Sequence, residues 1–142
     1  MQKQNYKNHV RLSPAYHFAT GIPLITLVIG SAINLFNSSG DNLYSASLIC
    51  LMSLIVLSIF FQARGFALRA QDRVIRTEEN FRHFILTNKM LDSRLTMDQM
   101  IALRFASDDE FPGLAQQAAD KKMSKADIKK AIRNWRGDYY RV

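Results

Sequence analysis

Three consecutive acidic residues, Asp108, Asp109 and Glu110, form the densest carboxylate group in the chain. Carboxylates bind metal ions and carry out general acid–base steps, so this group is the first candidate for chemistry. Its spacing does not place three ligands around one ion, and no histidine follows it in the sequence. Acidic residues also stabilise the first turn of a helix through its dipole. The sequence predicts that helix-start role here.

The other reactive side chains do not form a catalytic pattern. His83 follows Glu78 and Glu79, but the metal motif of two histidines flanking a glutamate on one helical face is absent. A nucleophile elbow and a glycine-rich phosphate loop are also absent. Cys50 is the single cysteine, so no intrachain disulfide is possible and a packing role is predicted. We therefore expect no catalytic residue, no cofactor and no metal site, and predict that the chain is not an enzyme.

The distribution of charge is more informative than any of these residues. No Asp, Glu, Lys or Arg lies between Arg11 and Asp41, or between Asp41 and Arg64. Each charge-free stretch holds an apolar run that, at about 1.5 Å per helical residue, covers the roughly 30 Å hydrocarbon core of a bilayer. A backbone in lipid must satisfy its own hydrogen bonds, so both runs should be helices.

The predicted fold is therefore an all-α membrane protein with a transmembrane hairpin. Its spans are 15–36 and 43–63, joined by a short turn-forming loop, 37–42, and preceded by a tail, 1–14. The alternative is a soluble protein with two buried core helices, which two adjacent charge-free stretches of this length disfavour.

Basic residues flank the predicted spans on one side only. The tail contains Lys3, Lys7 and Arg11, and the segment after the second span contains Arg64, Arg69, Arg73 and Arg76. The loop 37–42 contains no basic residue. The positive-inside rule therefore predicts that both termini lie in the cytoplasm. From Arg64 to Val142 there are 16 basic and 11 acidic residues, a net charge of +5 that would face anionic headgroups.

Small or weakly polar residues form a stripe on each predicted span. These residues are Thr26, Gly30 and Asn34 on the first, and Ala46, Cys50 and Ser53 on the second. Small residues allow membrane helices to approach closely. Two interpretations stay open: the stripes pack the two spans against each other, or they contact another subunit.

The second span is expected to continue as one long helix to about Met90. Its apolar positions fall roughly on one face: Phe66, Ala70, Val74, Phe81, Phe84, Ile85 and Leu91. This face should contact the downstream domain or a partner, and core packing against the domain is the default expectation. The region 64–142 is predicted to be a cytoplasmic helical domain that ends in a small three-helix subdomain.

Three N-terminal capping patterns predict the helices of this subdomain. They are Thr96-Met97-Asp98-Gln99, Ser107-Asp108-Asp109-Glu110 and Ser124-Lys125-Ala126-Asp127. Pro112 falls early in the second of these helices, where its missing N–H is tolerated if the helix starts a turn later.

The last predicted helix has a basic side. Its basic residues are Lys125, Lys129, Lys130, Arg133 and Arg136, and Ile128, Ile132 and Trp135 form its apolar side. Next to a cytoplasmic leaflet, such a side is expected to contact anionic lipid or an acidic protein partner. Nucleic acid is the weaker alternative, because acidic residues dilute the charge of this domain. A basic side that is only solvated also stays open.

Four phrases distributed along the chain resemble a known family. They are Gln4-Asn5-Tyr6-Lys7-Asn8-His9, Glu78-Glu79-Asn80-Phe81-Arg82-His83-Phe84, Ala102-Leu103-Arg104-Phe105-Ala106-Ser107-Asp108 and Ile128-Lys129-Lys130-Ala131-Ile132-Arg133-Asn134-Trp135-Arg136. Together they are similar to a family of small two-span bacterial inner-membrane proteins of unknown function. The resemblance implies a bacterial inner-membrane location and supplies no activity. A physical reason for such phrases is that the tail, the long helix and the domain meet at the cytoplasmic membrane face.

Three hypotheses for function follow. The leading one is a non-enzymatic integral membrane interaction protein that contacts lipid and forms a homo-oligomer or an accessory subunit of a larger inner-membrane complex. The second is an oligomeric pore or transport component, which the absence of ionisable residues within the spans disfavours. The third is a membrane-tethered cytoplasmic binder of nucleic acid or of a regulatory partner, which the mixed charge of the domain disfavours.

Overall fold

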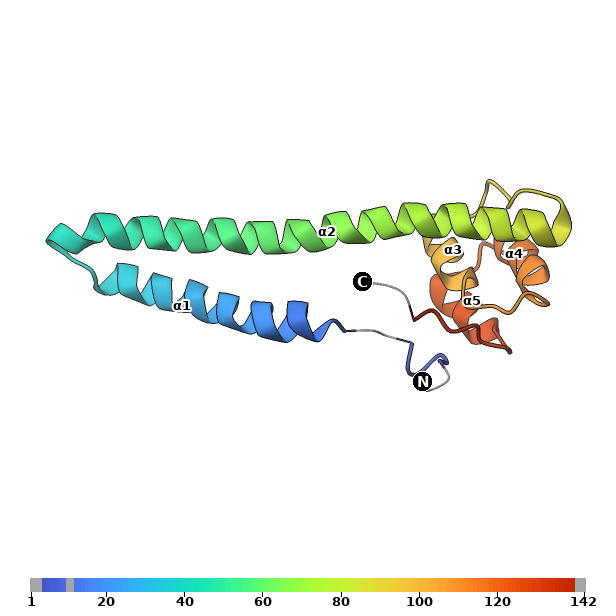
Figure 1. The fold of residues 1–142 in the computed structure, drawn as a ribbon, viewed down its shortest axis with the longest axis horizontal. Helices are drawn as coiled ribbons and strands as arrows, with labels where there is room; N and C mark the ends of the chain where they lie inside the picture. Colours follow the sequence, from blue (N-terminus) through green and yellow to red (C-terminus); the bar gives the residue numbers. More distant parts are fainter. Residues whose placement is uncertain (1–3, 10–11, 140–142) are drawn as a thin grey trace. The chain divides into compact units, whose positions relative to one another are not determined.

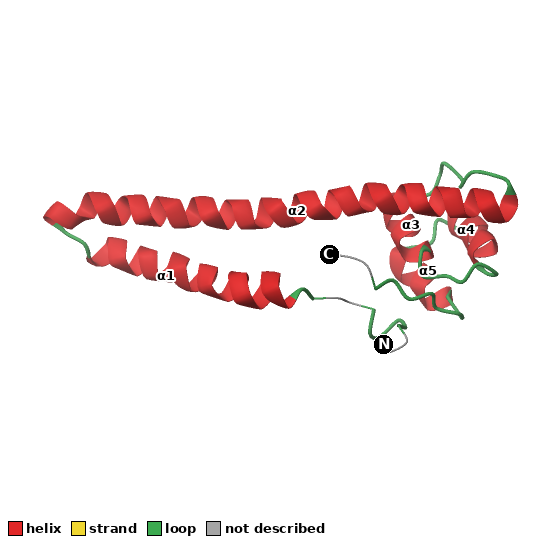
Figure 2. Cartoon of the chain, in the orientation of Figure 1, coloured by secondary structure: helices red, strands yellow, loops and turns green. Residues whose placement is uncertain are grey.

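The computed structural model describes residues 4–9 and 12–139, and these residues are helical with one isolated β-bridge. Five α-helices occur in this part of the chain (Figures 1 and 2): α1 (Gly21–Asn37), α2 (Leu43–Thr87), α3 (Met97–Leu103), α4 (Phe111–Asp120) and α5 (Lys125–Ala131). A π-helical segment, Ala15–Thr20, leads into α1, and a 3₁₀ turn, Gly40–Asn42, leads into α2. No strand occurs among the described residues, so the predicted all-α class is confirmed.

The chain divides into two compact units. One is Arg11–Ala67, and the other combines Leu68–Val142 with Met1–Val10. The boundary between them falls within α2. Two helical stretches, Ala15–Asn37 and Gly40–Thr87, are long and apolar enough to cross a membrane, as the charge pattern predicts.

In the unit Arg11–Ala67, α1 lies antiparallel beside the first part of α2 (Figure 1). The contact is made at its centre by two buried serines, Ser31 and Ser53, whose Oγ atoms are 2.9 Å apart. Each hydroxyl is also within hydrogen-bond distance of a carbonyl of its own helix, so neither is left unsatisfied. Leu24 and Ala46 are buried in the same contact.

A second contact joins the other end of this pair. The ring of Tyr16 stacks on the ring of Phe60 with centroids 4.1 Å apart, and Tyr16 Oη donates a 2.8 Å hydrogen bond to the Phe60 carbonyl. A Cβ at Gly21 would lie 3.6 Å from the Phe60 ring, an ordinary contact distance, so this approach does not depend on the glycine. The Arg64 guanidinium lies 5.5 Å from the Tyr16 ring centroid, which adds a cation–π contact.

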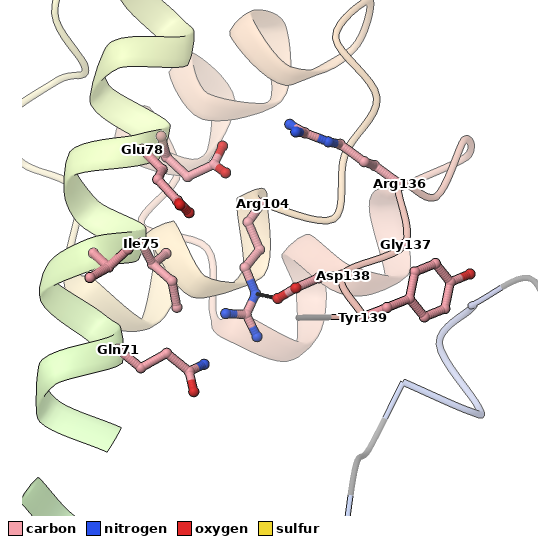
Figure 3. Close-up of a pocket in the computed structure, with 10 residues that line it drawn as sticks. Gln71, Ile75, Glu78, Arg104, Arg136, Gly137, Asp138 and Tyr139 are labelled. Atoms are coloured by element: carbon pink, nitrogen blue, oxygen red, sulfur yellow. Dashed lines mark ion pairs between the residues drawn. The ribbon is translucent and has the colours of Figure 1, made fainter. Parts of the chain in front are cut away.

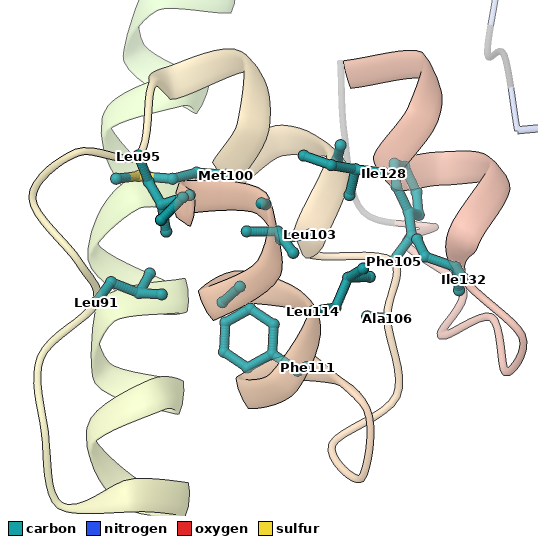
Figure 4. Packing of buried hydrophobic residues seen from close by; sticks show 14 residues of the cluster. Leu91, Leu95, Met100, Leu103, Phe105, Ala106, Phe111, Leu114, Ile128 and Ile132 are labelled. Carbon is teal, nitrogen blue, oxygen red and sulfur yellow. The ribbon is translucent and has the colours of Figure 1, made fainter. Parts of the chain in front are cut away.

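In the second unit, α3, α4 and α5 surround one apolar core (Figure 4). The cluster consists of Leu91, Leu95, Met100, Ala102, Leu103, Phe105, Ala106, Phe111, Leu114, Ala115, Ala118, Ala119, Ile128 and Ile132. Many of its members are alanines, so the short helices pack closely around a few large side chains.

Local capping decides where two of these helices begin. The Thr96 side chain accepts from the Gln99 backbone N–H, and the Gln99 side chain accepts from the Thr96 N–H, so the predicted capping box is formed. Ser124 accepts from the Asp127 N–H at 3.2 Å and caps α5. The helix predicted from Ser107 begins at Phe111, about one turn later. Pro112 then falls in its first turn, as expected.

The buried face of α2 differs from the default expectation. In the second unit, the side of α2 that packs against the domain contains Ile75, Glu79 and Arg82, and Glu79 is only 6% exposed. Most of the predicted apolar stripe is exposed instead: Phe66, Val74, Phe81, Phe84 and Ile85. The prediction that these residues pack in the core is therefore wrong. Polar contacts of Glu79 and Arg82 orient the helix instead. Leu91, beyond the helix end, does enter the core.

The last helix is shorter than predicted. α5 ends at Ala131, and the following residues are extended, with a bridge between Ala106 and Trp135 and a 2.7 Å bond from the Arg136 N–H to the Phe105 carbonyl. The Glu110 carboxylate accepts from the N–H groups of Arg133 and Asn134 at 3.2 and 2.8 Å, which satisfies them without another helical turn. Arg133 therefore does not belong to a basic helical face.

Candidate functional site

A cleft of about 360 Å³ opens in the second unit between α2 and the segment after α5 (Figure 3). Its walls are formed by Gln71, Val74, Ile75, Glu78, Glu79, Arg104, Arg136, Gly137, Asp138 and Tyr139. The walls contain both acidic and basic residues, so the cleft suits a polar or zwitterionic ligand better than a purely anionic one.

A buried arginine forms the floor of this cleft. Arg104 follows the last residue of α3 and is 8% exposed. Its Nε lies 3.3 Å from an Asp138 carboxylate oxygen, as Figure 3 shows. The guanidinium also lies 4.8 Å from the Phe105 ring centroid. This pair joins α3 to the extended segment, so the arginine has a structural role.

The second buried ion pair lies within α2, and its arginine also binds the domain. Arg82 Nη1 lies 3.0 Å from a Glu79 carboxylate oxygen, and its Nη2 donates to the Ala106 carbonyl at 2.7 Å. Arg82 also binds Asp108 at 2.6 Å and lies 4.3 Å from the Phe111 ring centroid. Burial raises the pKa of the Glu79 carboxyl above 4.5, although Arg82 opposes this rise.

These contacts explain the acidic group Asp108 to Glu110. The residues do precede α4, but Asp108 binds Arg82 and Glu110 binds the backbone after α5. Over the described residues, no three His, Cys, Asp or Glu side chains are arranged to hold a metal ion. The group therefore acts as a connector between segments that are distant in the sequence.

The N-terminal tail contacts the same domain. Gln4 and Asp138 exchange two hydrogen bonds: the Gln4 side-chain amide donates to the Asp138 carbonyl at 3.2 Å, and the Asp138 N–H donates back at 2.8 Å. The tail and the domain thus meet, as the resemblance led us to expect.

His9 provides the second tail contact. Its ring lies 6.0 Å from the Phe105 ring and 5.8 Å from the Trp135 ring, measured between centroids. Nδ1 lies 2.8 Å from the Tyr6 carbonyl, which can only accept, so Nδ1 carries the proton. In the neutral ring Nε2 then accepts from Lys129 Nζ at 2.8 Å.

Comparison with known families matches the chain over residues 1–142. The chain belongs to DUF6526, a family of unknown function. This confirms the predicted membership of an uncharacterised family. A comparison with curated proteins and another with solved structures each found no significant match. Membership of DUF6526 therefore supplies no activity, and the geometry must support any proposal about function.

The predicted packing residues occupy two different environments. On α2, Ala46 and Ser53 are buried against α1 and Cys50 is half-buried. On α1, the stripe Thr26, Gly30 and Asn34 is exposed and lines an outward groove of about 580 Å³. The α1 side of the contact uses Gly21, Leu24 and Ser31 instead. Their spacing of three and seven residues places all three on one helical face, and this periodicity is the sequence signal for the buried side of α1.

The predicted basic residues are dispersed. Lys125 forms an ion pair with Asp98 at 3.0 Å, and Lys129 contacts His9. Lys130, Arg133 and Arg136 are exposed, but the two arginines lie beyond the end of α5. Contact of these basic residues with anionic lipid or an acidic partner stays a prediction. Lys130, Arg133 and Arg136 are the members with the most exposed side chains.

Proposed function

We propose that this chain is a non-enzymatic integral membrane interaction protein of the bacterial inner membrane, either a homo-oligomer or an accessory subunit of a larger complex. The observation that carries the proposal is the exposure of its two most apolar helices. Of the 18 most apolar consecutive residues in each helix, only 17% and 11% are buried. A core helix of a soluble protein is mostly buried, whereas lipid covers an exposed apolar helix at no cost.

The outer surface of α1 illustrates this exposure. Ile22, Ile25, Ile29 and Ile33 are 55–58% exposed, and they lie on a helix whose charge-free sequence begins after Arg11. In water, each square ångström of apolar surface left uncovered forfeits about 25 cal/mol. A bilayer removes this penalty. The interaction role is supported by the groove along Thr26, Gly30 and Asn34, since small residues facing outward permit a further helix to approach.

The proposed topology places both termini in the cytoplasm and the connection between α1 and α2 in the periplasm. In a Cys50→Ala background, a membrane-impermeant thiol reagent should label Ser39→Cys in intact cells. It should label Lys7→Cys only after the cells are permeabilised, because the flanking basic residues stay inside. Both positions are exposed, so access depends on the membrane alone. Labelling of Lys7→Cys in intact cells would contradict the topology, and release of the protein by alkaline carbonate would contradict membrane integration.

Gly30→Leu is expected to weaken association with a neighbouring subunit by about tenfold, equivalent to about 1.4 kcal/mol. No atom lies within 4 Å of a Cβ at Gly30, so the added side chain meets empty groove and should leave the fold intact. Ser31→Leu is the matched control, because it places the same bulk against Ser53 and should lower thermal stability by about 1–3 kcal/mol. Native-gel mobility and thermal melts in mild detergent measure the two effects. Unchanged association in Gly30→Leu would mean that this groove meets only lipid.

A further inference from the structure

The second unit exposes a continuous apolar stripe along α2. Val74, Phe81, Phe84 and Ile85 are 55%, 63%, 44% and 65% exposed. Large apolar side chains gathered on one helical face usually mark a binding surface. The opposite face of the same helix is covered by the domain through Ile75, Glu79 and Arg82.

The spacing of the stripe is that of a coiled coil. Steps of four and three residues connect the successive positions Ala70, Val74, Thr77, Phe81 and Phe84. This spacing defines alternating d and a positions of a heptad repeat. In that register Ile75, Glu79 and Arg82 take the outer b and f positions. The domain therefore covers the back of the helix, and its cleft reaches the edge of the seam at Val74 and Glu78, while Val74, Phe81 and Phe84 keep exposed surface.

We propose that this seam binds the same seam of a second copy of the chain, as a parallel two-stranded coiled coil. The proposal rests on the proposed function and names the partner of its homo-oligomeric form. Each copy contributes Val74, Phe81 and Phe84 to the shared core, which removes their exposed surface from water.

Charge complementarity selects the second copy and its orientation. Arg73 is a g position and Glu78 is the following e position, which face each other between the strands of a parallel pair. Twofold symmetry forms this ion pair twice. An antiparallel pair that keeps Val74 and Phe81 on the seam brings the two Glu78 carboxylates together, which is unfavourable.

The membrane accounts for the shortness of the seam. The seam from Ala70 to Phe84 covers just over two heptads, and an isolated pair of helices of that length is marginal in water. Two copies anchored in one bilayer have the same orientation and a high effective concentration, which favours a parallel pair. The cytoplasmic end of α2 then needs to supply only a small part of the association energy.

Disulfide cross-linking of the full-length protein in native membranes tests this arrangement. In a Cys50→Ala background, Thr77→Cys lies on the seam and Arg76→Cys lies beside it at an outer position, and both native residues are exposed. Mild oxidation should link Thr77→Cys into dimers at least about tenfold faster than Arg76→Cys, because d positions face each other across a parallel seam. Equal rates at the two positions would overturn the proposal.

Charge reversal supplies an independent arm of the test. Adding Arg73→Glu to the Thr77→Cys protein should lower its dimer yield by roughly tenfold, since two attractive pairs become repulsive. Adding Glu78→Arg as well should restore the yield. An unaffected yield, or no rescue, would overturn the parallel pairing.

The outcomes also separate this inference from the proposed function. If Thr77→Cys gives no dimer while the protein resists carbonate extraction and co-purifies with a different membrane subunit, the coiled coil is wrong and the interaction function stands. If carbonate releases the protein, the proposed function fails whatever the cross-linking shows.

Discussion

Replacing Arg82 with methionine is expected to lower the free energy of unfolding of the second unit by about 3–5 kcal/mol. The side chain is 10% exposed, pairs with Glu79 on the same helix, and joins α2 to the domain through Asp108 and the Ala106 carbonyl. Methionine keeps most of the packing volume but leaves the 6% exposed Glu79 without its cation. The single tryptophan, Trp135, lies in this unit, so its fluorescence reports denaturant unfolding of the full-length protein in detergent.

The pH dependence of this loss is a further check. Because the pKa of Glu79 is raised above 4.5 in the folded state, the folded protein retains this proton at higher pH than the unfolded chain does. The stability that Glu79 contributes is thus greatest below about pH 4.5 and is lost as pH rises through the raised pKa. Removing Arg82 raises this pKa further, so the loss should be largest near neutral pH.

Glu79→Gln added to Arg82→Met is the matched control. The double variant contains no buried carboxylate, so it should recover a large part of the lost stability near neutral pH, because an unpaired buried charge is the main penalty. A loss that is the same in acid and at neutral pH, with no recovery in the double variant, would show that Arg82 acts through Ala106, Asp108 and Phe111 and not by neutralising Glu79.

Phe105→Ala is expected to cost about 3–5 kcal/mol of unfolding free energy. Phe105 is 0% exposed and is one of the largest fully buried side chains of the described chain. Its ring lies 5.2 Å from the Trp135 ring and 6.0 Å from the His9 ring, so its loss should also loosen the tail. Denaturant melts measure the first effect, and faster proteolysis of the N-terminal tail at native conditions measures the second.

Met90→Ala is the control for this prediction. It removes a large apolar side chain from a position that is 67% exposed and lies outside the seam, so the unfolding free energy should change by less than about 0.5 kcal/mol. If both alanine variants lost equal stability, the core assigned around Phe105 would be wrong. If Phe105→Ala left tail proteolysis unchanged, the His9 contact would not hold the tail.

Much of this architecture is determined by patterns local in the sequence. The charge-free stretches before and after Asp41 predict the long apolar helices, because lipid-compatible helices need uninterrupted apolar runs. Thr96 and Ser124 predict helix starts, because a capping side chain binds N–H groups only two or three residues away. These features need no knowledge of what packs against them.

Tertiary structure alone decided the features that depend on distant partners. The buried face of α2 is chosen by Arg82, whose partner Asp108 lies 26 residues further along the chain. The end of α5 is decided by Glu110, which satisfies the N–H groups of Arg133 and Asn134. Helical periodicity reports which residues share a face, but not which face is covered, since a buried ion pair can orient a helix against its apolar stripe. That is why the sequence predicted the long helix correctly and its buried side wrongly.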